Sequence, residues 1–383
     1  MIDFGDQVRK ALKIQGVSLR GAARELHYDV AYLSRVMSGK QAPSAELIQA
    51  VNELLGLSLT VEEASPHDDE MDAWELVRRV QASDVGAATL SRLERTFDDL
   101  AMAYPKADPD DLLRKVRRHS GYVGKLLDAK KTLAEHRRLL TVGGWLCLLG
   151  ATLHIDLKQE GAAMARLQSA AALAHEAAVS EIEAWCFETD AWRVLTDGDY
   201  VRALELSRVA QAAAPPGSSA LIQATAQEGR AHARLGNRQE TYSAIGRVQA
   251  FSAAVGTPES PEHHYRYDPA KSLSYTATTL AWLGDVAAEP YAREVIKRLC
   301  PSDNAAFWPR RVASANIDLA LVLVTEDRLD EACVSAQRAI LSGKVVPSNH
   351  WRALEIVTAV EARQLPEASD LREVYEGLKP LEQ

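Results

Sequence analysis

The sequence predicts an all-α protein with a small N-terminal domain of five helices and a C-terminal superhelix of repeated helix pairs. Three observations lead to this prediction. Aromatic residues make up only 6% of the 383-residue chain, whereas β-strands favour aromatic and β-branched side chains. Apolar residues recur at steps of three and four, the period of an α-helix. Small residues followed by a turn recur every 38–48 residues, which is typical of helical repeats.

The chain is too long for one compact core, because single cores stop growing at roughly 250–300 residues. We expect an N-terminal domain over residues 1–59, an acidic linker over 60–72 and a repeat domain over 73–383. Residues 61–74 contain six carboxylates and no basic residue, and such a run of like charges extends a chain by self-repulsion. The alternative is that these carboxylates form the acidic first turn of a helix that starts near Met71.

Composition and terminal sequence argue against several classes of protein. The four cysteines are far apart and form no C-x-x-C pair, so we expect neither a zinc site nor a disulfide framework, and the chain suits a reducing compartment. The first residues lack the pattern of a signal peptide, and no run of about 18 apolar residues lacks a charge. We therefore expect a cytoplasmic protein with no cofactor, no metal and no membrane contact.

Short helices are predicted over residues 2–57, where apolar residues recur at three- and four-residue steps within short segments. The second helix is expected over Leu19–Glu25 and the third over Asp29–Met37. Residues of the types that begin and end helices mark these limits. They are Gly16 at the end of the first helix, Ser18 and Asp29 as caps of the second and third, Gly39 after the third, and Pro43 and Ser44 before the fourth.

Two motifs in this region carry a resemblance to a known family. Tyr-Leu-Ser-Arg-Val occupies residues 32–36, and Gly-Lys-Gln-Ala-Pro-Ser occupies residues 39–44. Ala22 and Ala23 are small, so the second and third helices can cross closely. In order and spacing these residues resemble the helix-turn-helix of XRE-type, phage-repressor-like regulators. The resemblance covers about the first 57 residues and implies a DNA-binding domain; the alternative is a purely structural helical subdomain.

The third helix is the one that would enter the major groove of double-stranded DNA. With Leu33 and Val36 buried, its other face points outward. Apolar side chains on that face suit thymine methyl groups, and a hydroxyl suits either donors or acceptors on the bases. The resemblance implies base contacts for Val30, Ala31 and Ser34, and phosphate contacts for Arg20, Arg35 and Lys40.

Asp29 departs from the family pattern, in which small uncharged residues are usual at that position. Its carboxylate can cap the helix, but it repels nearby phosphates. Residues 1–60 carry seven basic and six acidic residues, so one domain alone should bind DNA weakly, since affinity depends on the number of neutralised phosphates. We therefore predict a homodimer on an inverted repeat with half-sites about one helical turn apart.

From about Trp74 the sequence predicts helices to its end, arranged in repeated pairs. In each pair a small residue lets the second helix approach closely, and a turn seven residues later reverses the chain. Because one pair cannot bury its own apolar face, neighbouring pairs stack into a superhelix. Residues 183–215 resemble a tetratricopeptide repeat; the alternative is an irregular Ala-rich bundle. The small residues and turns are Ala191 with Gly198, Gly229 with Gly236, Ala277 with Gly284, Ala320 with Asp327, and a weaker copy at Ala151 and Lys158.

The first helix of each pair would line the concave side of such a superhelix. Aromatic side chains beside Arg and Lys suit a peptide with an acidic or C-terminal carboxylate, or an anionic small molecule. Taken singly, each Trp is also explained as core filling and each Arg as a solvated surface residue. The candidate ligand-binding residues are Trp145, Trp185, Glu188, Trp192, Gln223, Arg230, Arg234, Lys271, Tyr275 and Trp282.

A helix-turn-helix joined to such repeats is similar to the RRNPP group of bacterial peptide-sensing regulators. Residues 80–128 and 140–157 are also similar to a large group of XRE–repeat regulators in GC-rich bacteria. These resemblances imply a transcription regulator in quorum sensing or signalling, with a repressor favoured, whose repeats dimerise and bind a peptide or small-molecule effector. Two alternatives stay open: a protein-interaction adaptor that uses the helix-turn-helix as a recruiting module, and a ligand-independent, constitutive repressor.

Enzyme motifs are weak or incomplete. Residues 121–127 (GYVGKLL) lack the spacing of a phosphate-binding loop, and His175-Glu176 lacks the second histidine of a zinc protease motif. Residues 263–267 (HHYRY) could hold a metal or touch a ligand, but their place between two prolines favours a solvated loop. No pairing of a nucleophile with a histidine base is recognisable, so we do not expect an enzyme.

Overall fold

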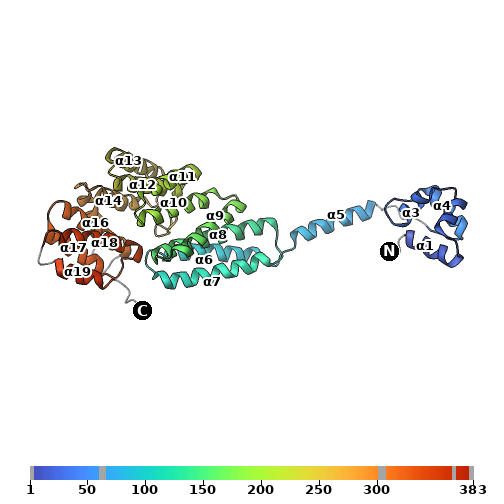
Figure 1. Cartoon of the computed structure of the whole chain (residues 1–383), viewed down its shortest axis with the longest axis horizontal. Helices are drawn as coiled ribbons and strands as arrows, with labels where there is room; N and C mark the ends of the chain where they lie inside the picture. Colours follow the sequence, from blue (N-terminus) through green and yellow to red (C-terminus); the bar gives the residue numbers. More distant parts are fainter. Residues whose placement is uncertain (1–3, 60–65, 301–307, 365–367, 379–383) are drawn as a thin grey trace. The chain divides into compact units, whose positions relative to one another are not determined.

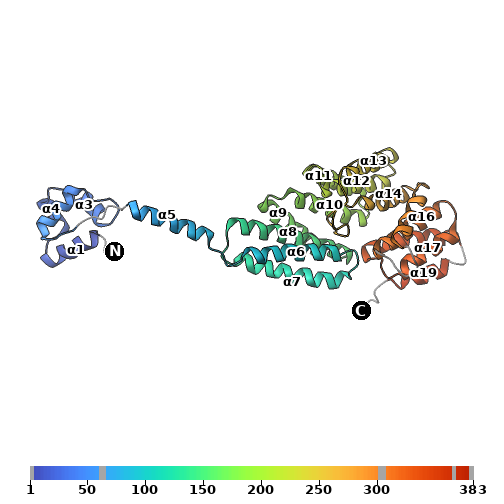
Figure 2. The same cartoon turned by 180° about the vertical axis from the view of Figure 1, so that it is seen from behind.

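The computed structural model describes residues 4–59, 66–300, 308–364 and 368–378. Within these ranges it contains nineteen α-helices, one short 3-10 helix and no strand, which confirms the all-α prediction. The chain folds as two compact units, residues 1–81 and 82–383 (Figures 1 and 2).

The first unit begins with a bundle of four helices around a small apolar core. Leu33, Leu47 and Val51 are fully buried in this core. Ala22 and Ala23 are also buried on α2, which packs against α3, as expected from their small side chains. The helices of the bundle are α1 (Phe4–Gln15), α2 (Leu19–Glu25), α3 (Val30–Met37) and α4 (Ala45–Leu55).

Side chains that accept hydrogen bonds from free backbone N–H groups fix the helix starts in this bundle. At α2, the Ser18 hydroxyl accepts from the Gly21 amide at 3.1 Å. At α3, Asp29 Oδ1 accepts from the Ala31 and Tyr32 amides at 2.9 and 3.0 Å. The caps predicted for these two helices are thus confirmed.

A fifth helix, α5 (Pro66–Gln81), completes the first unit. It includes residues 66–72 of the predicted linker. These residues are therefore helical, as in the alternative that the sequence left open, although the helix begins at Pro66 and not near Met71. Residues 60–65 of that linker lie outside the described residues. The boundary between the two compact units follows Gln81.

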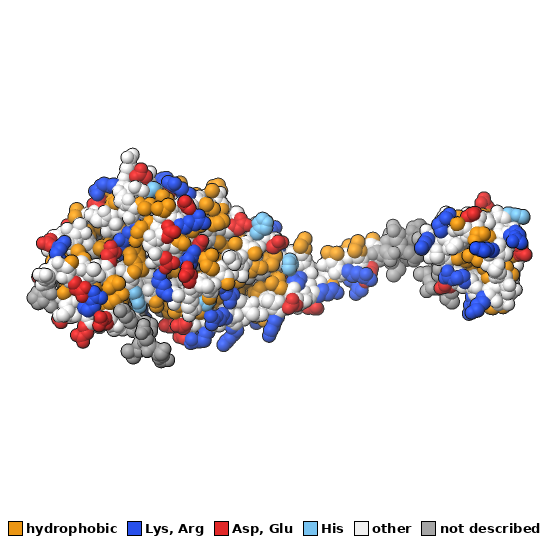
Figure 3. Space-filling model, in the orientation of Figure 1, with side chains coloured by type: hydrophobic (Ala, Val, Ile, Leu, Met, Phe, Trp, Pro, Cys, Tyr) orange, Lys and Arg blue, Asp and Glu red, His pale blue; other side chains and the backbone are white. Residues whose placement is uncertain are grey.

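The C-terminal part of α5 has one apolar and one charged side. Four large apolar side chains on it are 53–67% exposed: Trp74, Leu76, Val77 and Val80. Glu75 pairs with Arg78 and Arg79 at 2.6 and 2.9 Å. Figure 3 shows the hydrophobic side chains along one edge of this helix and basic ones along the other. A helix with a large exposed apolar face is typical of an interaction surface.

The second unit is a superhelix of helix pairs. Five pairs follow the predicted repeat, and consecutive pairs pack side by side (Figures 1 and 2). The pairs are α8 (Leu133–Asp156) with α9 (Glu160–Ala177), α10 (Ser180–Thr196) with α11 (Tyr200–Ala213), α12 (Ser219–Arg234) with α13 (Arg238–Ala254), α14 (Pro269–Leu283) with α15 (Ala288–Leu299), and α16 (Pro309–Thr325) with α17 (Leu329–Leu341). The flanking helices are α6 (Ala87–Ala103), α7 (Pro109–Asp128), η1 (Pro347–Asn349), α18 (His350–Glu361) and α19 (Ala368–Glu376).

The register of the repeats is the one that the sequence predicts. The small residue of every pair is buried, and a Cβ atom built on Gly229 would lie only 3.1 Å from the Cβ atom of Ala244 in the partner helix. The turn residues all have a left-handed backbone, with φ between +58° and +89°, at Lys158, Gly198, Gly236, Gly284 and Asp327. Close helix contact and a left-handed turn therefore recur together, which confirms the helix-pair prediction.

The prediction of a solvated loop at residues 263–267 is wrong. His263, Tyr265 and Tyr267 are only 2–3% exposed. The ring centroid of Tyr265 lies 5.2 Å from that of Trp185 in α10. Four of the five side chains in this segment carry rings, and their burial removes a large area from water. Within the described residues, no group of three or more His, Cys, Asp and Glu side chains is arranged to hold a metal ion.

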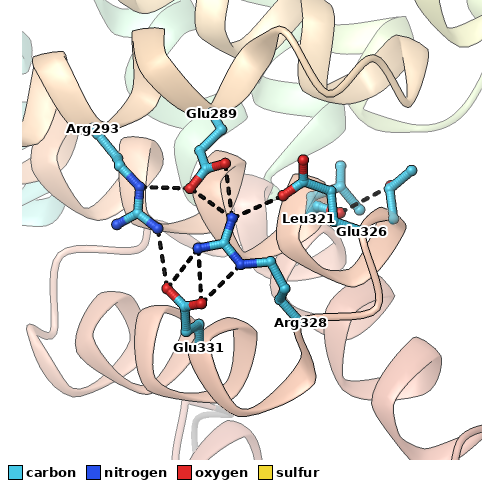
Figure 4. Close-up of polar contacts among 7 residues, drawn as sticks. Glu289, Arg293, Leu321, Glu326, Arg328 and Glu331 are labelled. Atoms are coloured by element: carbon cyan, nitrogen blue, oxygen red, sulfur yellow. Dashed lines mark hydrogen bonds and ion pairs between the residues drawn. The ribbon is translucent and has the colours of Figure 1, made fainter.

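An exposed ion-pair network joins α15 to α17 (Figure 4). Arg328 donates to both carboxylate oxygens of Glu289 at 2.9 Å and to Glu331 at 2.8 and 2.9 Å. Arg293 donates to the same two carboxylates at 2.7 and 3.1 Å. The four side chains are 19–52% exposed, so water screens these contacts and each contributes little to stability.

One helix among the described residues, α8, is long and apolar enough to cross a membrane by length and composition. Its most apolar window has a mean hydropathy of 1.4, and 89% of that window is buried inside the protein. This burial is typical of the central helix of a globular domain.

Candidate functional site

A cavity of about 250 Å³ lies among the first helices of the repeat pairs. Residues of α8, α10, α12, α14 and α16 form its walls, together with residues at and after the end of the repeats. Eight of the ten predicted ligand-binding residues line it: Trp185, Glu188, Trp192, Gln223, Arg230, Lys271, Tyr275 and Trp282. The repeat register thus brought these residues to one wall, and their binding to a ligand stays a prediction.

Basic side chains outnumber carboxylates on this wall. The basic residues are Arg230, Lys271, Arg310, Arg311, Lys344 and Arg352, and the carboxylates are Asp156 and Glu188. The whole chain has a net charge of −9, so the cavity concentrates positive charge within an acidic protein. Low-dielectric walls strengthen the field of such a cluster and favour anions inside it.

Arg230 is held on the wall by two neighbours. Its guanidinium carbon lies 4.1 Å from the centroid of the Tyr275 ring, a cation–π distance. Its Nη1 donates to Gln227 Oε1 at 3.1 Å. Both contacts orient the guanidinium without neutralising its charge.

Lys271 is buried beside the loop that precedes α14. Its ammonium donates to the carbonyl oxygens of Arg266 and His263 at 2.6 and 3.2 Å. Burial and, to a smaller extent, the charge of Arg311 lower the pKa of Lys271 to about 7, although the charge of Asp268 acts in the opposite direction. Lys271 therefore changes its charge near neutral pH.

Glu188 is a buried carboxyl group, which makes the cavity less positive when it is ionised. The Gln223 amide donates to its Oε1 at 3.1 Å. Burial raises the pKa of Glu188 to about 7, although this hydrogen bond and the charge of Arg230 both lower it. A protonated Glu188 is neutral below pH 7, so the cavity is most positive in mildly acidic solution.

Asp156, at the end of α8, connects the first helices of the second unit to the last ones. Its Oδ2 accepts from the Tyr104 hydroxyl at 2.9 Å and from Arg310 Nη1 at 3.1 Å. Ser348 in η1 donates to Oδ1 at 3.4 Å, and Arg310 also donates to the Ala107 carbonyl at 2.6 Å. Burial raises the pKa of Asp156, and the charge of Arg310 opposes that rise. These contacts close the superhelix around the cavity.

Two predicted ligand-binding residues do not line the cavity. Trp145 packs into the core, where its ring centroid lies 5.4 Å from that of Phe97 and 5.1 Å from that of Tyr265. Arg234 donates from both terminal nitrogens to Glu355 at 2.9 Å. Trp145 therefore fills the core, which was the alternative explanation for each Trp. The charge of Arg234 is balanced by the carboxylate of Glu355.

Four basic residues of the wall were not predicted from the sequence: Arg310, Arg311, Lys344 and Arg352. Arg310 and Arg311 follow Pro309 in the first turn of α16. Cations are unfavourable at the positive N-terminal end of a helix, so two arginines there were a signal for a nearby anion. Lys344 and Arg352 lie beyond the last repeat, where the repeat register makes no prediction.

The first unit exposes the helix face that was predicted to enter DNA. Leu33 and Val36 are buried in the bundle. All six residues predicted to contact DNA are exposed on α2, on α3 or just after it: Arg20, Val30, Ala31, Ser34, Arg35 and Lys40. Their contacts with bases and phosphates stay predictions.

Two further contacts shape this face. Arg35 Nε donates to Gln41 Oε1 at 3.0 Å, so Gln41, which was not predicted as a site residue, orients the arginine. The Asp29 carboxylate caps α3, which gives a local structural reason for an acidic residue at a position where the family usually has none.

Residues 8–61 match the family model described as Helix-turn-helix. The N-terminal domain is a helix-turn-helix domain. In this domain α2 and α3 form the two helices of the motif, and α3 is the helix that enters the major groove in such proteins. The chain is therefore a DNA-binding regulator.

No curated protein matches the chain. Among solved structures, that of Bacillus thuringiensis PlcR in complex with the peptide PapR7 and DNA is similar, with 11% sequence identity and a TM-score of 0.27. The match covers 99% of this chain and 94% of the PlcR chain.

Proposed function

We propose that this protein is a cytoplasmic transcriptional repressor that binds an inverted-repeat operator as a homodimer and responds to a ligand in the cavity of the second unit. The observation that carries the proposal is the exposed face of α3 within a helix-turn-helix domain. Bases are contacted by the short side chains of that face, Val30, Ala31 and Ser34. Phosphates are bound by Arg20, Arg35 and Lys40, which fixes the helix in the groove.

Dimerisation is supported by the first unit. Residues 1–60 contain only one more basic than acidic residue, so one DNA-binding domain has a weak attraction to DNA, and two paired domains double the phosphate contacts. The exposed apolar face of α5, which includes Trp74, Val77 and Val80, is suited to pairing with a second copy. A two-fold dimer then recognises half-sites separated by roughly 34–36 Å, one turn of DNA.

Ligand response is supported by the construction of the cavity wall. Residues of α10, α12, α14 and α16 face the same space, so one ligand, a peptide or a small molecule, contacts several repeat pairs at once. Binding changes the curvature of the superhelix and with it the spacing of the paired DNA-binding domains. A ligand shifts this equilibrium only by its difference in affinity for the two arrangements.

The test uses an operator selected from genomic fragments and a low-molecular-weight extract of the source cells. Replacement of Trp192 and Arg230 by alanine should abolish the effect of the extract on operator affinity, while affinity without extract stays within about threefold of wild type. Fluorescence anisotropy of labelled operator measures both. Arg202→Ala, at an exposed position of α11, is the matched control. Equal loss of operator binding and of ligand response in the double variant contradicts the proposal.

A further inference from the structure

Four side-chain donors on the cavity wall have no hydrogen-bond partner among the described residues. They are Gln227 Nε2, Arg230 Nε, Trp282 Nε1 and Arg352 Nε. Gln227 is fully buried, and Arg352 is only 4% exposed. Buried polar groups are nearly always paired in folded proteins, and an unpaired donor is unfavourable. Each of these nitrogens is itself covered by protein atoms, so a ligand in the cavity would reach it only after a shift of the side chain.

Three basic side chains gather on one part of the wall. Arg230, Lys271 and Arg311 line both the main cavity and a smaller one of about 120 Å³ that shares this wall. Arg310 pairs with Asp156 and Arg352 with Asp318, whereas Arg230, Lys271 and Arg311 form no ion pair with any described residue. The carboxylate of Asp268 is near enough to raise the pKa of Lys271 and of Arg311, and Asp318 lines the smaller cavity. Unpaired cations that lie close together repel one another, so an anion between them is strongly favoured.

The first turn of α16 adds to this positive potential. α16 is 17 residues long and begins at Pro309, so Arg311 lies in its first turn. The backbone N–H groups at a helix start carry a partial positive charge and bind carboxylate or phosphate groups. Because Arg311 lines the cavity, the positive end of α16 lies at the same wall as the three basic side chains.

The size of the cavity limits what it holds. The cavity has a volume of about 250 Å³. The volume lies just below the roughly 300–1,000 Å³ of most small-molecule sites. Aromatic rings of Trp192 and Trp282 form other parts of the wall and suit a flat apolar group.

We propose that this cavity binds a compact organic anion, a small molecule with a carboxylate or phosphate group beside a flat ring, rather than a peptide. The anionic group lies among Arg230, Lys271 and Arg311, and the ring packs against Trp192 and Trp282. The inference rests on the proposed ligand-sensing function and narrows its effector from a peptide or small molecule to this one class.

Isothermal titration calorimetry on the full-length protein tests the inference with four probes. Benzoate and phenyl phosphate carry the two kinds of anionic group, benzamide is a neutral match to benzoate, and an acidic heptapeptide with a free carboxyl terminus represents a peptide effector. We expect benzoate or phenyl phosphate to bind at one site per chain, at least tenfold more tightly than benzamide. The stronger of the two anions identifies the preferred group.

Variants then place the site. Arg230→Met and Arg311→Met should each weaken the binding of the stronger anion at least tenfold, and Arg202→Met, the same change on exposed α11, should leave it unchanged. Each cavity variant removes an unpaired charge, so its melting temperature without ligand should equal or exceed that of wild type. A melting temperature that falls marks a folding defect; the benzamide-to-benzoate affinity ratio of wild type then decides the inference by itself.

Four results overturn the inference: neither anion binds at millimolar concentration, benzamide binds as tightly as benzoate, the heptapeptide binds more tightly than either anion, or both cavity variants fold and bind the anion like wild type. None of these four results bears on the proposed ligand response, which the experiment with the cell extract tests separately. If the anions bind as expected but saturation leaves operator affinity unchanged, the inference stands and the proposed coupling between cavity and DNA fails.

Discussion

The exposed face of α3 and the wall of the cavity differ in how far water reaches their polar groups. On α3, every residue predicted to contact DNA is exposed, so water satisfies its polar atoms in the free protein. On the cavity wall, Gln227 and the Arg352 guanidinium, which pairs with Asp318, are buried, and the ammonium of Lys271 is buried with a lowered pKa. The face of α3 exchanges water for its ligand, whereas the cavity wall already holds its polar groups largely away from water before a ligand binds.

This difference predicts two thermodynamic behaviours. DNA binding replaces hydrated contacts, so it depends mainly on salt and on a few side chains of α3. Ligand binding relieves repulsion between cations and also raises the stability of the second unit by mass action.

Ala31→Glu should have the largest effect. It places a carboxylate on the exposed face of α3, where bases and phosphates would lie, and should weaken operator binding at least 100-fold without unfolding the domain. Fluorescence anisotropy measures the affinity, and circular dichroism checks the fold. Gln49→Glu makes the same charge change at an exposed position of α4. Equal affinities of the two variants would show that α3 is not the DNA-contacting helix.

Asp156→Asn should destabilise the second unit by about 3 kcal/mol, because it leaves the mostly buried Arg310 without its carboxylate. Urea denaturation measures this loss. Asp197→Asn is the exposed control, since Asp197 and its partner Lys158 are each 42% exposed, and it should cost less than about 0.5 kcal/mol. Similar losses in both variants would remove the claimed contrast between enclosed and exposed ion pairs.

Anion affinity should fall as pH rises through 7. Below pH 7, Lys271 is charged and Glu188 is neutral; above pH 7, Lys271 loses its charge and Glu188 gains one, since the pKa of each is about 7. Both changes make the cavity less positive. The other titratable groups at the cavity do not oppose this trend: burial raises the pKa of Asp156 and lowers that of His264 well below its usual value.

Calorimetry with benzoate at pH 6, 7 and 8 checks this dependence, because the charge of benzoate is constant over that range. We expect the affinity for benzoate to fall by about tenfold per pH unit above 7 for each of the two groups, Lys271 and Glu188, whose charge affects binding. Glu188→Gln should remove the contribution of Glu188 and keep that of Lys271. An affinity that rises with pH would contradict the assigned charges.

Arg328→Gln should have the smallest effect, although Arg328 makes more ion-pair contacts in Figure 4 than Arg310 makes at Asp156. Water screens these exposed contacts, so we expect the melting temperature to fall by at most about 2 °C. Differential scanning calorimetry measures the change. A fall as large as that of Asp156→Asn would mean that the number of contacts, and not their burial, sets their contribution.

Local features of the fold could be predicted from the sequence because they depend on neighbouring residues. Ser18 and Asp29 begin helices through hydrogen bonds that reach two or three residues ahead. The turn positions such as Gly198 and Asp327 depend on one left-handed backbone conformation. The spacing between these positions then determines which face of each first helix lines the concave side of the superhelix. For this reason, most of the residues predicted to bind a ligand do lie on the cavity wall.

The rest of the cavity depends on contacts between distant residues. Asp156 meets Ser348 and Arg310 only because the superhelix closes on itself, which no local pattern encodes. The ring-rich segment 263–267 is buried because it packs against distant helices: the ring centroid of Tyr265 lies 5.1–6.1 Å from those of Phe97 in α6, Trp145 in α8 and Trp185 in α10. Trp145 has the same spacing as the cavity residues but packs against Phe97, so its role is decided by its neighbours and not by its position in the repeat.

The proposed function depends most on the binding of α3 to an operator as part of a two-fold dimer. Selection of genomic fragments with the full-length protein, followed by footprinting of the enriched DNA, tests this directly. We predict one enriched inverted repeat, protected over two half-sites whose centres lie about 10–10.5 base pairs or a multiple of that distance apart. Protection of a single half-site by a monomer, or no enriched sequence at all, would contradict it.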